Sequence, residues 1–163
     1  MPEAGPAQTF GVVPTEVLLS QDGFSFLTAI FEGRLPYPPI MQTLGFRMTA
    51  CERERVVFAS TPSYAHYNPL GVVHGGYAAT LLDSAVACAI QTTMQKGEVC
   101  TTLELKLNLV RAMTQDTGEV SAEGRVLHRG RSVATAEGYI RDRDGKLYAH
   151  ATTACIIIPG KSE

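Results

Sequence analysis

The chain has 163 residues and a formal net charge of −2, with 18% charged and 45% hydrophobic residues. This length suits one domain with a core of its own. The near-neutral charge gives no basic field for nucleic acid, and no apolar run resembles a membrane span or a signal peptide. We therefore expect a cytoplasmic globular protein without a nucleic-acid or membrane partner.

The four cysteines lie far apart among apolar or strand-like neighbours, at Cys51, Cys88, Cys100 and Cys155. There is no C-x-x-C pair and no Cys/His pair at the spacing of metal ligands. The sequence predicts free thiols in a reducing compartment and no metal site.

The N-terminal part is rich in Pro, Gly and Ala, and we expect residues 1–20 to form a flexible arm before a single domain over residues 21–163. A short amphipathic helix is predicted over Ser20–Gly33, because Phe24, Leu27, Ile30 and Phe31 share one face. The prolines of Leu35–Pro39 cannot continue that helix, so an extended segment is expected there.

A long helix is predicted from Tyr77 to Met94, ending near Gly97. Apolar residues occupy nearly every face of it, which is typical of a helix buried on all sides. Asp83 lies about two turns inside, too deep for an N-cap. A buried carboxylate without a partner is costly, so Asp83 either has a structural partner or takes part in chemistry.

Six strand-like runs surround this helix in the sequence, at residues 45–52, 55–61, 99–110, 119–128, 132–141 and 147–158. The order of helix, two strands, long helix and four strands predicts an α+β fold, with one antiparallel sheet curled around the long helix. A stripe of small residues, Ala134, Ala136 and Gly138, would let the helix approach the sheet closely. In the third run, four alternating leucines are predicted to share one face: Leu103, Leu105, Leu107 and Leu109.

Gly75 and Gly76 lie at the predicted start of the long helix. The first N–H groups of a helix have no internal partner, and the helix dipole favours negative charge there, so a developing oxyanion could bind. Alternatively, the two glycines only permit a sharp turn. Gly75 and Asp83 are eight residues apart, about 12 Å along a helix. If both serve one carbonyl, the acid must come from a second copy across a two-fold axis.

The segment from Asn68 through His74-Gly75-Gly76 to Asp83 resembles the hot-dog-fold acyl-CoA thioesterases, most closely their PaaI-like (phenylacetate-pathway-like) branch. Thr101 to Arg111 and the hairpin Gly130-Arg131-Ser132 resemble later parts of the same branch. The resemblance covers about residues 45–158, and the first forty residues match no family that we recognise.

The resemblance implies a hot-dog fold, homodimers that often pair into tetramers, and hydrolysis of an acyl-CoA at the dimer interface, with no cofactor beyond the coenzyme A of the substrate. It assigns Asp83 as general base or nucleophile, and Gly75 as the donor to the thioester oxygen. The remaining catalytic assignments are His74 to orient or polarise the site, Asn68 to hold the water or the opposite carboxylate, and Thr102 or Thr101 to hold the water. Contacts with the substrate or its phosphates are expected from Gly76, Thr101, Arg129, Gly130, Arg131 and Ser132, with Arg111 as a further candidate. For Arg129 and Arg131 a solvated hairpin tip is the alternative.

Two other functions are compatible with the same residues. An acyl-thioester hydratase or dehydratase would use His74 and Asp83 as a proton-transfer pair, and a non-catalytic acyl-CoA binding protein would use the same fold without turnover. The acyl group is not specified by the sequence. Aryl and short or medium chains are candidates, and the candidate wall residues are Phe24, Phe31, Tyr64 and Tyr67.

Overall fold

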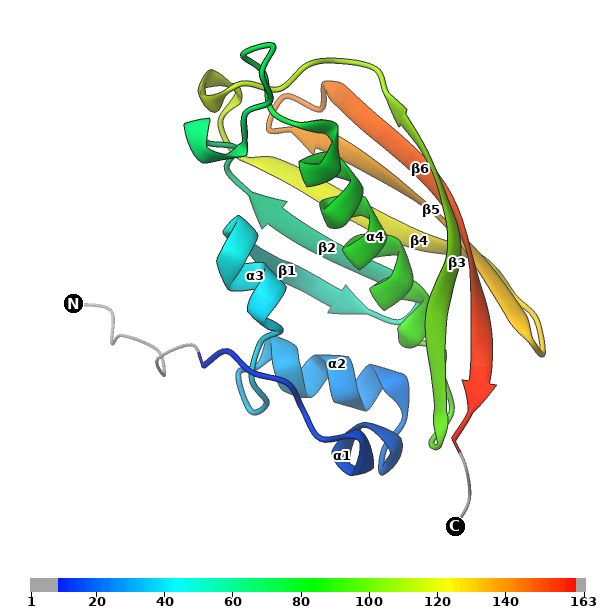
Figure 1. Ribbon diagram of the computed structural model, residues 1–163. Helices are drawn as coiled ribbons and strands as arrows, with labels where there is room; N and C mark the ends of the chain where they lie inside the picture. Colours follow the sequence, from blue (N-terminus) through cyan, green and yellow to red (C-terminus); the bar gives the residue numbers. More distant parts are fainter. Residues whose placement is uncertain (1–8, 161–163) are drawn as a thin grey trace.

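The computed structural model describes residues 9–160. A long helix, α4 (Gly75–Gln91), lies against the concave face of one six-stranded sheet, as Figure 1 shows. The strands follow the order β1-β2-β4-β5-β6-β3, and every neighbouring pair is antiparallel. The predicted α+β hot-dog architecture is confirmed.

The strand boundaries fall within about two residues of those predicted. They are β1 (Phe46–Glu52), β2 (Arg55–Ser60), β3 (Glu98–Leu109), β4 (Val120–Arg129), β5 (Val133–Asp142) and β6 (Leu147–Pro159). Strand β3 lies at one edge of the sheet, next to β6 only. This position matters for the site, because the outer edge of β3 has no strand paired to it within the described chain.

Small residues allow α4 to sit close to the sheet, as predicted. Ala134 and Ala136 are fully buried, and a Cβ added to Gly138 would lie 2.8 Å from Val86 Cγ1 on the helix. On the next strand, a Cβ at Gly124 would run into the backbone of Ala85. The helix is therefore held by close packing of its apolar body against β4 and β5.

The prediction that four leucines of β3 share one face is wrong for Leu103. The register between β3 and β6 shifts between Thr102 and Glu104, and this bulge turns Leu103 outward, where it is 59% exposed. Leu105 and Leu107 do pack on the core, but Leu109, at the end of the strand, is 54% exposed. A bulge inserts one unpaired residue and so breaks the two-residue alternation.

The N-terminal region contains three helices instead of the single one predicted: α1 (Thr15–Leu19), α2 (Gly23–Phe31) and α3 (Pro39–Leu44). Asp22 caps α2, accepting hydrogen bonds from Phe24 N and Ser25 N, so the chain breaks between α1 and α2. The extended segment predicted over Leu35–Pro39 ends at Pro38. Pro39 then begins α3, because proline is well suited to the first position of a helix.

Part of the predicted flexible arm is bound to the body of the protein. Residues 1–8 lie outside the described chain, whereas Gly11 N donates to Tyr37 O and Tyr37 N donates to Thr9 O, both at 2.9 Å. The division into an arm at residues 1–20 and a domain at 21–163 stays a prediction.

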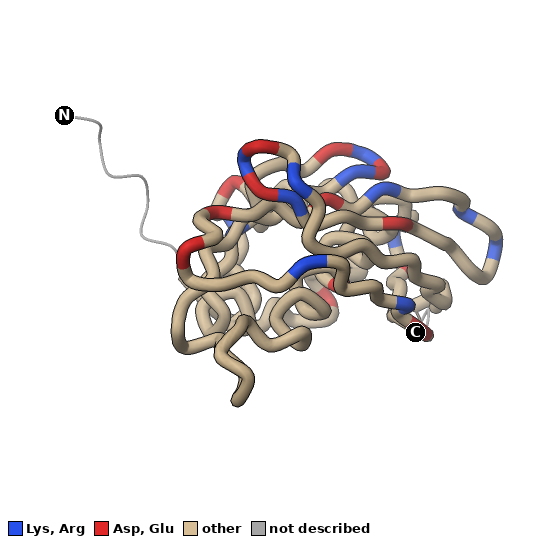
Figure 2. The backbone as a smooth tube through the Cα atoms, turned by 90° about the horizontal axis from the view of Figure 1, so that it is seen from above, with Lys and Arg blue, Asp and Glu red and all other residues tan. Residues whose placement is uncertain are grey.

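Charged residues of both signs are interspersed along the chain in Figure 2, and many form ion pairs, such as Arg55 with Glu123 at 2.7 Å. Over residues 9–160, no helix is both long enough and apolar enough to cross a membrane.

Candidate active site

The loop before α4 is held by the side chain of Asn68. Its Oδ1 accepts hydrogen bonds from Leu70 N at 2.9 Å and from Val72 N at 3.4 Å, and His74 N donates to His66 O at 2.8 Å. No partner for the amide donors of Asn68 is found within residues 9–160. The loop geometry is therefore fixed by the Asn68 oxygen, while its nitrogen stays available.

His74 is the N-cap of α4. Its Nδ1 accepts a hydrogen bond from Gly76 N at 2.8 Å, so in the neutral ring the proton is on Nε2. The Gly76 N–H, one of the two expected glycine donors, is thus occupied. The N–H of Gly75 has no acceptor in the described part of the chain and remains free for a ligand.

Gly75 lies in a hollow of about 290 Å³ between the start of α4 and the end of β3. Asn68, His74 and Arg111 line the same hollow, so the structure brings together three predicted site residues and the further candidate Arg111. A Cβ on Gly75 would lie 2.7 Å from Leu109 Cδ1, so a larger residue would crowd the wall of the hollow. The arrangement suits an acceptor oxygen beside the helix N-terminus.

Asp83 faces β3 and is only partly buried. Thr102 Oγ1 donates a 2.9 Å hydrogen bond to Asp83 Oδ1, whereas the neighbouring Thr101 is exposed. Of the two candidate threonines, Thr102 is the one that contacts the carboxylate.

Asp83 lines a second hollow of about 400 Å³ with Ala79, Thr80 and Thr102. Gly75 does not border this hollow, and Asp83 does not border the first. One chain therefore holds the free amide and the carboxylate in separate places, in agreement with their eight-residue separation on α4. Ala79 and Thr80 were not predicted as site residues. Their positions could have indicated them, because residues three and four before Asp83 lie on the same face of the helix.

The basic hairpin between β4 and β5 lies away from both hollows. Arg129 pairs with Glu98 at 2.6 Å and also donates to Gly130 O, and Ser132 O accepts from Ile157 N. Glu98 begins β3 and Leu109 ends it, so this hairpin and Gly75 lie at opposite ends of that strand (Figure 1). Arg131 is exposed and forms no ion pair with any described residue.

All four cysteines are free thiols, and no group of three metal-ligating side chains occurs in residues 9–160.

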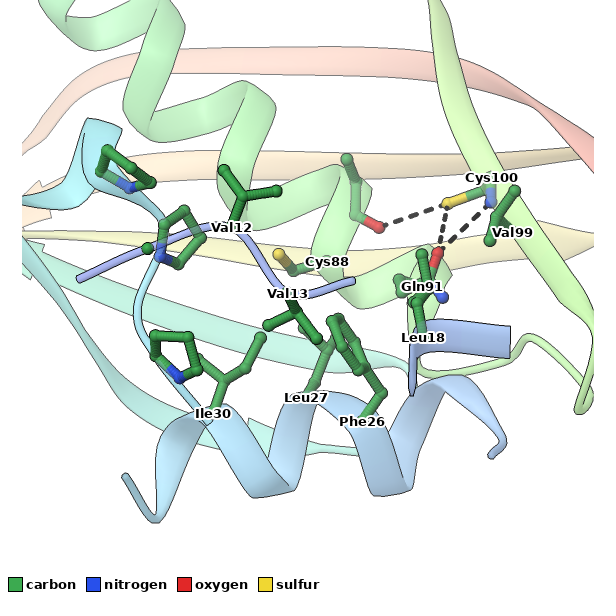
Figure 3. A pocket seen from close by; sticks show the side chains of 15 residues that line it. Val12, Val13, Leu18, Phe26, Leu27, Ile30, Cys88, Gln91, Val99 and Cys100 are labelled. Atoms are coloured by element: carbon green, nitrogen blue, oxygen red, sulfur yellow. Dashed lines mark hydrogen bonds between the residues drawn. The ribbon is translucent and has the colours of Figure 1, made fainter. Parts of the chain in front are cut away.

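A third hollow, of about 380 Å³, lies between α2, α4 and residues 11–13 (Figure 3). The predicted wall residues Phe24 and Phe31 do not line it, nor do Tyr64 and Tyr67. Phe26 and Ile30 of the same helix α2 do. No sequence pattern indicates this cavity, because segments far apart in the chain form it.

This chain is similar to known thioesterases and related hydrolases. The profile of the thioesterase superfamily matches residues 70–149. A phenylacetic acid degradation-related protein of Ralstonia eutropha JMP134 is 31% identical, with a TM-score of 0.73 over 83% of this chain and 99% of that one. The E. coli PaaI protein, at 20% identity, has a TM-score of 0.72 over 88% of this chain and 98% of its own. A 1,4-dihydroxy-2-naphthoyl-CoA hydrolase of Listeria monocytogenes is 24% identical over 66% of this chain and 86% of its own.

Proposed function

This chain belongs to the thioesterase superfamily and is a thioester hydrolase, and we propose that it hydrolyses acyl-CoA at a site shared by two copies. The observation that carries the proposal is the unoccupied N–H of Gly75 at the start of α4, beside an amide already used by His74. An oxyanion that forms there would be stabilised by that donor and by the helix dipole.

Asp83 supplies the base in this proposal. Its carboxylate takes a proton from water while the water oxygen bonds to the thioester carbon, and the carbonyl oxygen becomes an oxyanion on Gly75 N–H. When the tetrahedral intermediate collapses, the C–S bond breaks, and the proton passes from Asp83 to the departing CoA thiolate. In the alternative mechanism, the Asp83 carboxylate attacks the thioester carbon itself and displaces the CoA thiolate. Water then hydrolyses the resulting acyl–Asp83 anhydride.

The two groups would meet in a homodimer. The free outer edge of β3 can pair with β3 of a second copy, and an antiparallel pairing would bring Asp83 of one chain toward Gly75 of the other. The same pairing would carry the hairpin at Arg129–Ser132 toward the partner's Gly75, where the exposed Arg131 could bind a CoA phosphate. The pairing of dimers into tetramers and a cytoplasmic location remain predictions.

In this site His74 has a positioning role, since its Nδ1 holds Gly76 and fixes the first turn of α4. The hydratase alternative would use His74 as a proton-transfer group through Nε2, which has no acceptor among the described residues. Asn68 is assigned to the attacking water through its free amide, and Thr102 to holding the Asp83 carboxylate.

The test is release of free thiol from a panel of saturated, enoyl and aryl acyl-CoAs. Thiol release from saturated substrates supports the proposal, whereas a change seen only with enoyl or hydroxyacyl thioesters supports the hydratase. Asp83→Asn should lower kcat at least about a hundredfold, because a positioned base contributes that much or more, and should leave acyl-CoA binding intact. Asp144→Asn, in an exposed turn, is the matched control. Full activity in Asp83→Asn would contradict the assignment.

A further inference from the structure

The cavity in Figure 3 and the hollow at Asp83 lie along the same face of α4. Ala87 and Gln91 line the cavity and follow Asp83 at intervals of four residues, so all three share one face of α4. Beside this helix face, Cys100 of β3 also lines the cavity, two residues before Thr102. The cavity therefore begins one helical turn beyond the carboxylate, about 6 Å along the axis.

The chemistry of the walls suits a hydrocarbon. Apart from Gln91, the lining side chains are apolar or thiols. Burial raises the pKa of Cys88 to about 12, and a hydrogen bond with Cys155 together with burial raises the pKa of Cys100, so both thiols stay neutral. The Gln91 Oε1 accepts from Cys100 N and from Cys100 Sγ, both at 3.3 Å, whereas its buried Nε2 has no hydrogen-bond partner among the described residues.

The outer wall comes from the part of the chain before the family match. Val12 and Val13 cross the cavity opposite α4, Leu18 comes from α1, and Phe26 and Ile30 come from α2 (Figure 3). All of them precede residue 70, where the superfamily profile begins to match. The size of the cavity is thus set by residues 11–39 as well as by the common core.

We infer that this cavity binds the acyl tail of a medium-chain acyl-CoA, with the N-terminal segment setting the chain length; the inference rests on the proposed function. A water molecule takes about 30 Å³ of liquid volume, so a cavity of about 380 Å³ holds on the order of a dozen heavy atoms. Saturated chains of about eight to twelve carbons would fill it, since pockets of this size bury most of an apolar ligand. An acetyl group would end near Asp83 and leave the cavity empty.

Two variants with opposite effects test the inference. Ala87→Leu narrows the cavity next to Asp83, and Phe26→Ala enlarges it at α2. The measurement is kcat/KM for thiol release over even-numbered saturated acyl-CoAs from two to sixteen carbons. Ala87→Leu should move the optimum to shorter chains, with at least about a tenfold loss on the longest good substrate, because a single methylene is worth that much in a fitted pocket. Phe26→Ala should move the optimum to longer chains.

Phe24→Ala is the matched control, since Phe24 lies on the same helix but packs under the Arg53 guanidinium, 4.7 Å from its ring centroid, outside the cavity. It should leave the chain-length profile unchanged. Thermal melting checks that each variant folds, and if Phe26→Ala does not fold, Ala87→Leu decides alone. An active wild type whose profile is the same in both cavity variants would overturn this inference only. A wild type that releases thiol from none of the substrates would overturn the proposed function and this inference with it.

Discussion

Thr102 on β3 donates a hydrogen bond of 2.9 Å to the carboxylate of Asp83 on α4, and it does so immediately before a bulge in the strand. The bulge turns Leu103 outward, where it is 59% exposed, and leaves Thr102 facing the helix. The register of β3 thus changes directly beside the residue that contacts the acid, and bulges are common next to functional sites.

Thr102→Val should reduce kcat about tenfold while KM changes little, because the carboxylate loses the donor that orients it. Hydrogen bonds to charged groups are worth about 1.5–3 kcal/mol, which sets the scale of the effect. Steady-state thiol release measures it, and Thr102→Ser should restore most of the rate. Thr101→Val is the control, since Thr101 is exposed beside it. Equal losses in the two valine variants would contradict a specific role for Thr102.

The sequence was sufficient for the sheet and the central helix because both follow simple hydrophobic patterns. Alternation marks the strands, and the uninterrupted apolar run from Tyr77 marks a buried helix. The bulge at Leu103 could not be predicted, because nothing in the alternating leucines shows that the register with β6 shifts. Helix α3 was missed because prolines that exclude a helix interior also favour a helix start.

The sequence named the residues of the candidate site but did not show the contacts between them. The sequence predicted that Gly75 and Asp83 of one chain are too far apart to serve the same carbonyl. The separate hollows agree with that prediction. It could not show that His74 occupies the amide of Gly76 or that Thr102, rather than Thr101, contacts Asp83. These contacts depend on the orientation of side chains in the folded protein, and a sequence pattern carries no information on that orientation.

Gly124→Ala should destabilise the protein by about 2 kcal/mol or prevent folding, within the usual cost of overpacking a core. The added Cβ would meet the backbone of Ala85 and come to 2.7 Å from Val86 N, and neither atom can move without displacing α4. Urea unfolding measures the loss. Gly11→Ala is the control, because its Cβ would meet only Pro36, at an ordinary 3.7 Å. A fully stable Gly124→Ala variant would contradict the close approach of α4 to β4.

Asp22→Ala should lower the free energy of unfolding by about 1 kcal/mol near neutral pH, the typical value of an N-cap. The Ser25 hydroxyl donates to Asp22 at 2.7 Å and, with backbone donors, holds the pKa of Asp22 below its ordinary value of 3.8. Because the folded pKa is depressed, the stabilisation is complete above pH 3.8 and is lost as the pH falls through the folded pKa. Urea unfolding at several pH values should show the difference from wild type shrinking below that point. Asp144→Ala, in the exposed β5–β6 turn, should show no such trend, and a pH-independent difference for Asp22→Ala would argue against the cap.

Mixing two inactive variants tests whether each site is built from two chains. Asp83→Asn removes the proposed base, and Gly75→Val fills the hollow beside the free amide, where even a Cβ comes to 2.7 Å from Leu109. In a heterodimer of the two, both defects fall in one site, and the other site receives an intact Gly75 from one chain and an intact Asp83 from the other. Random pairing should therefore recover about a quarter of the wild-type rate of thiol release after the variants are unfolded and refolded together. Refolding each variant alone should recover nothing, and a mixture that also stays inactive, although size exclusion shows mixed dimers, would place both groups within single chains and refute the shared site.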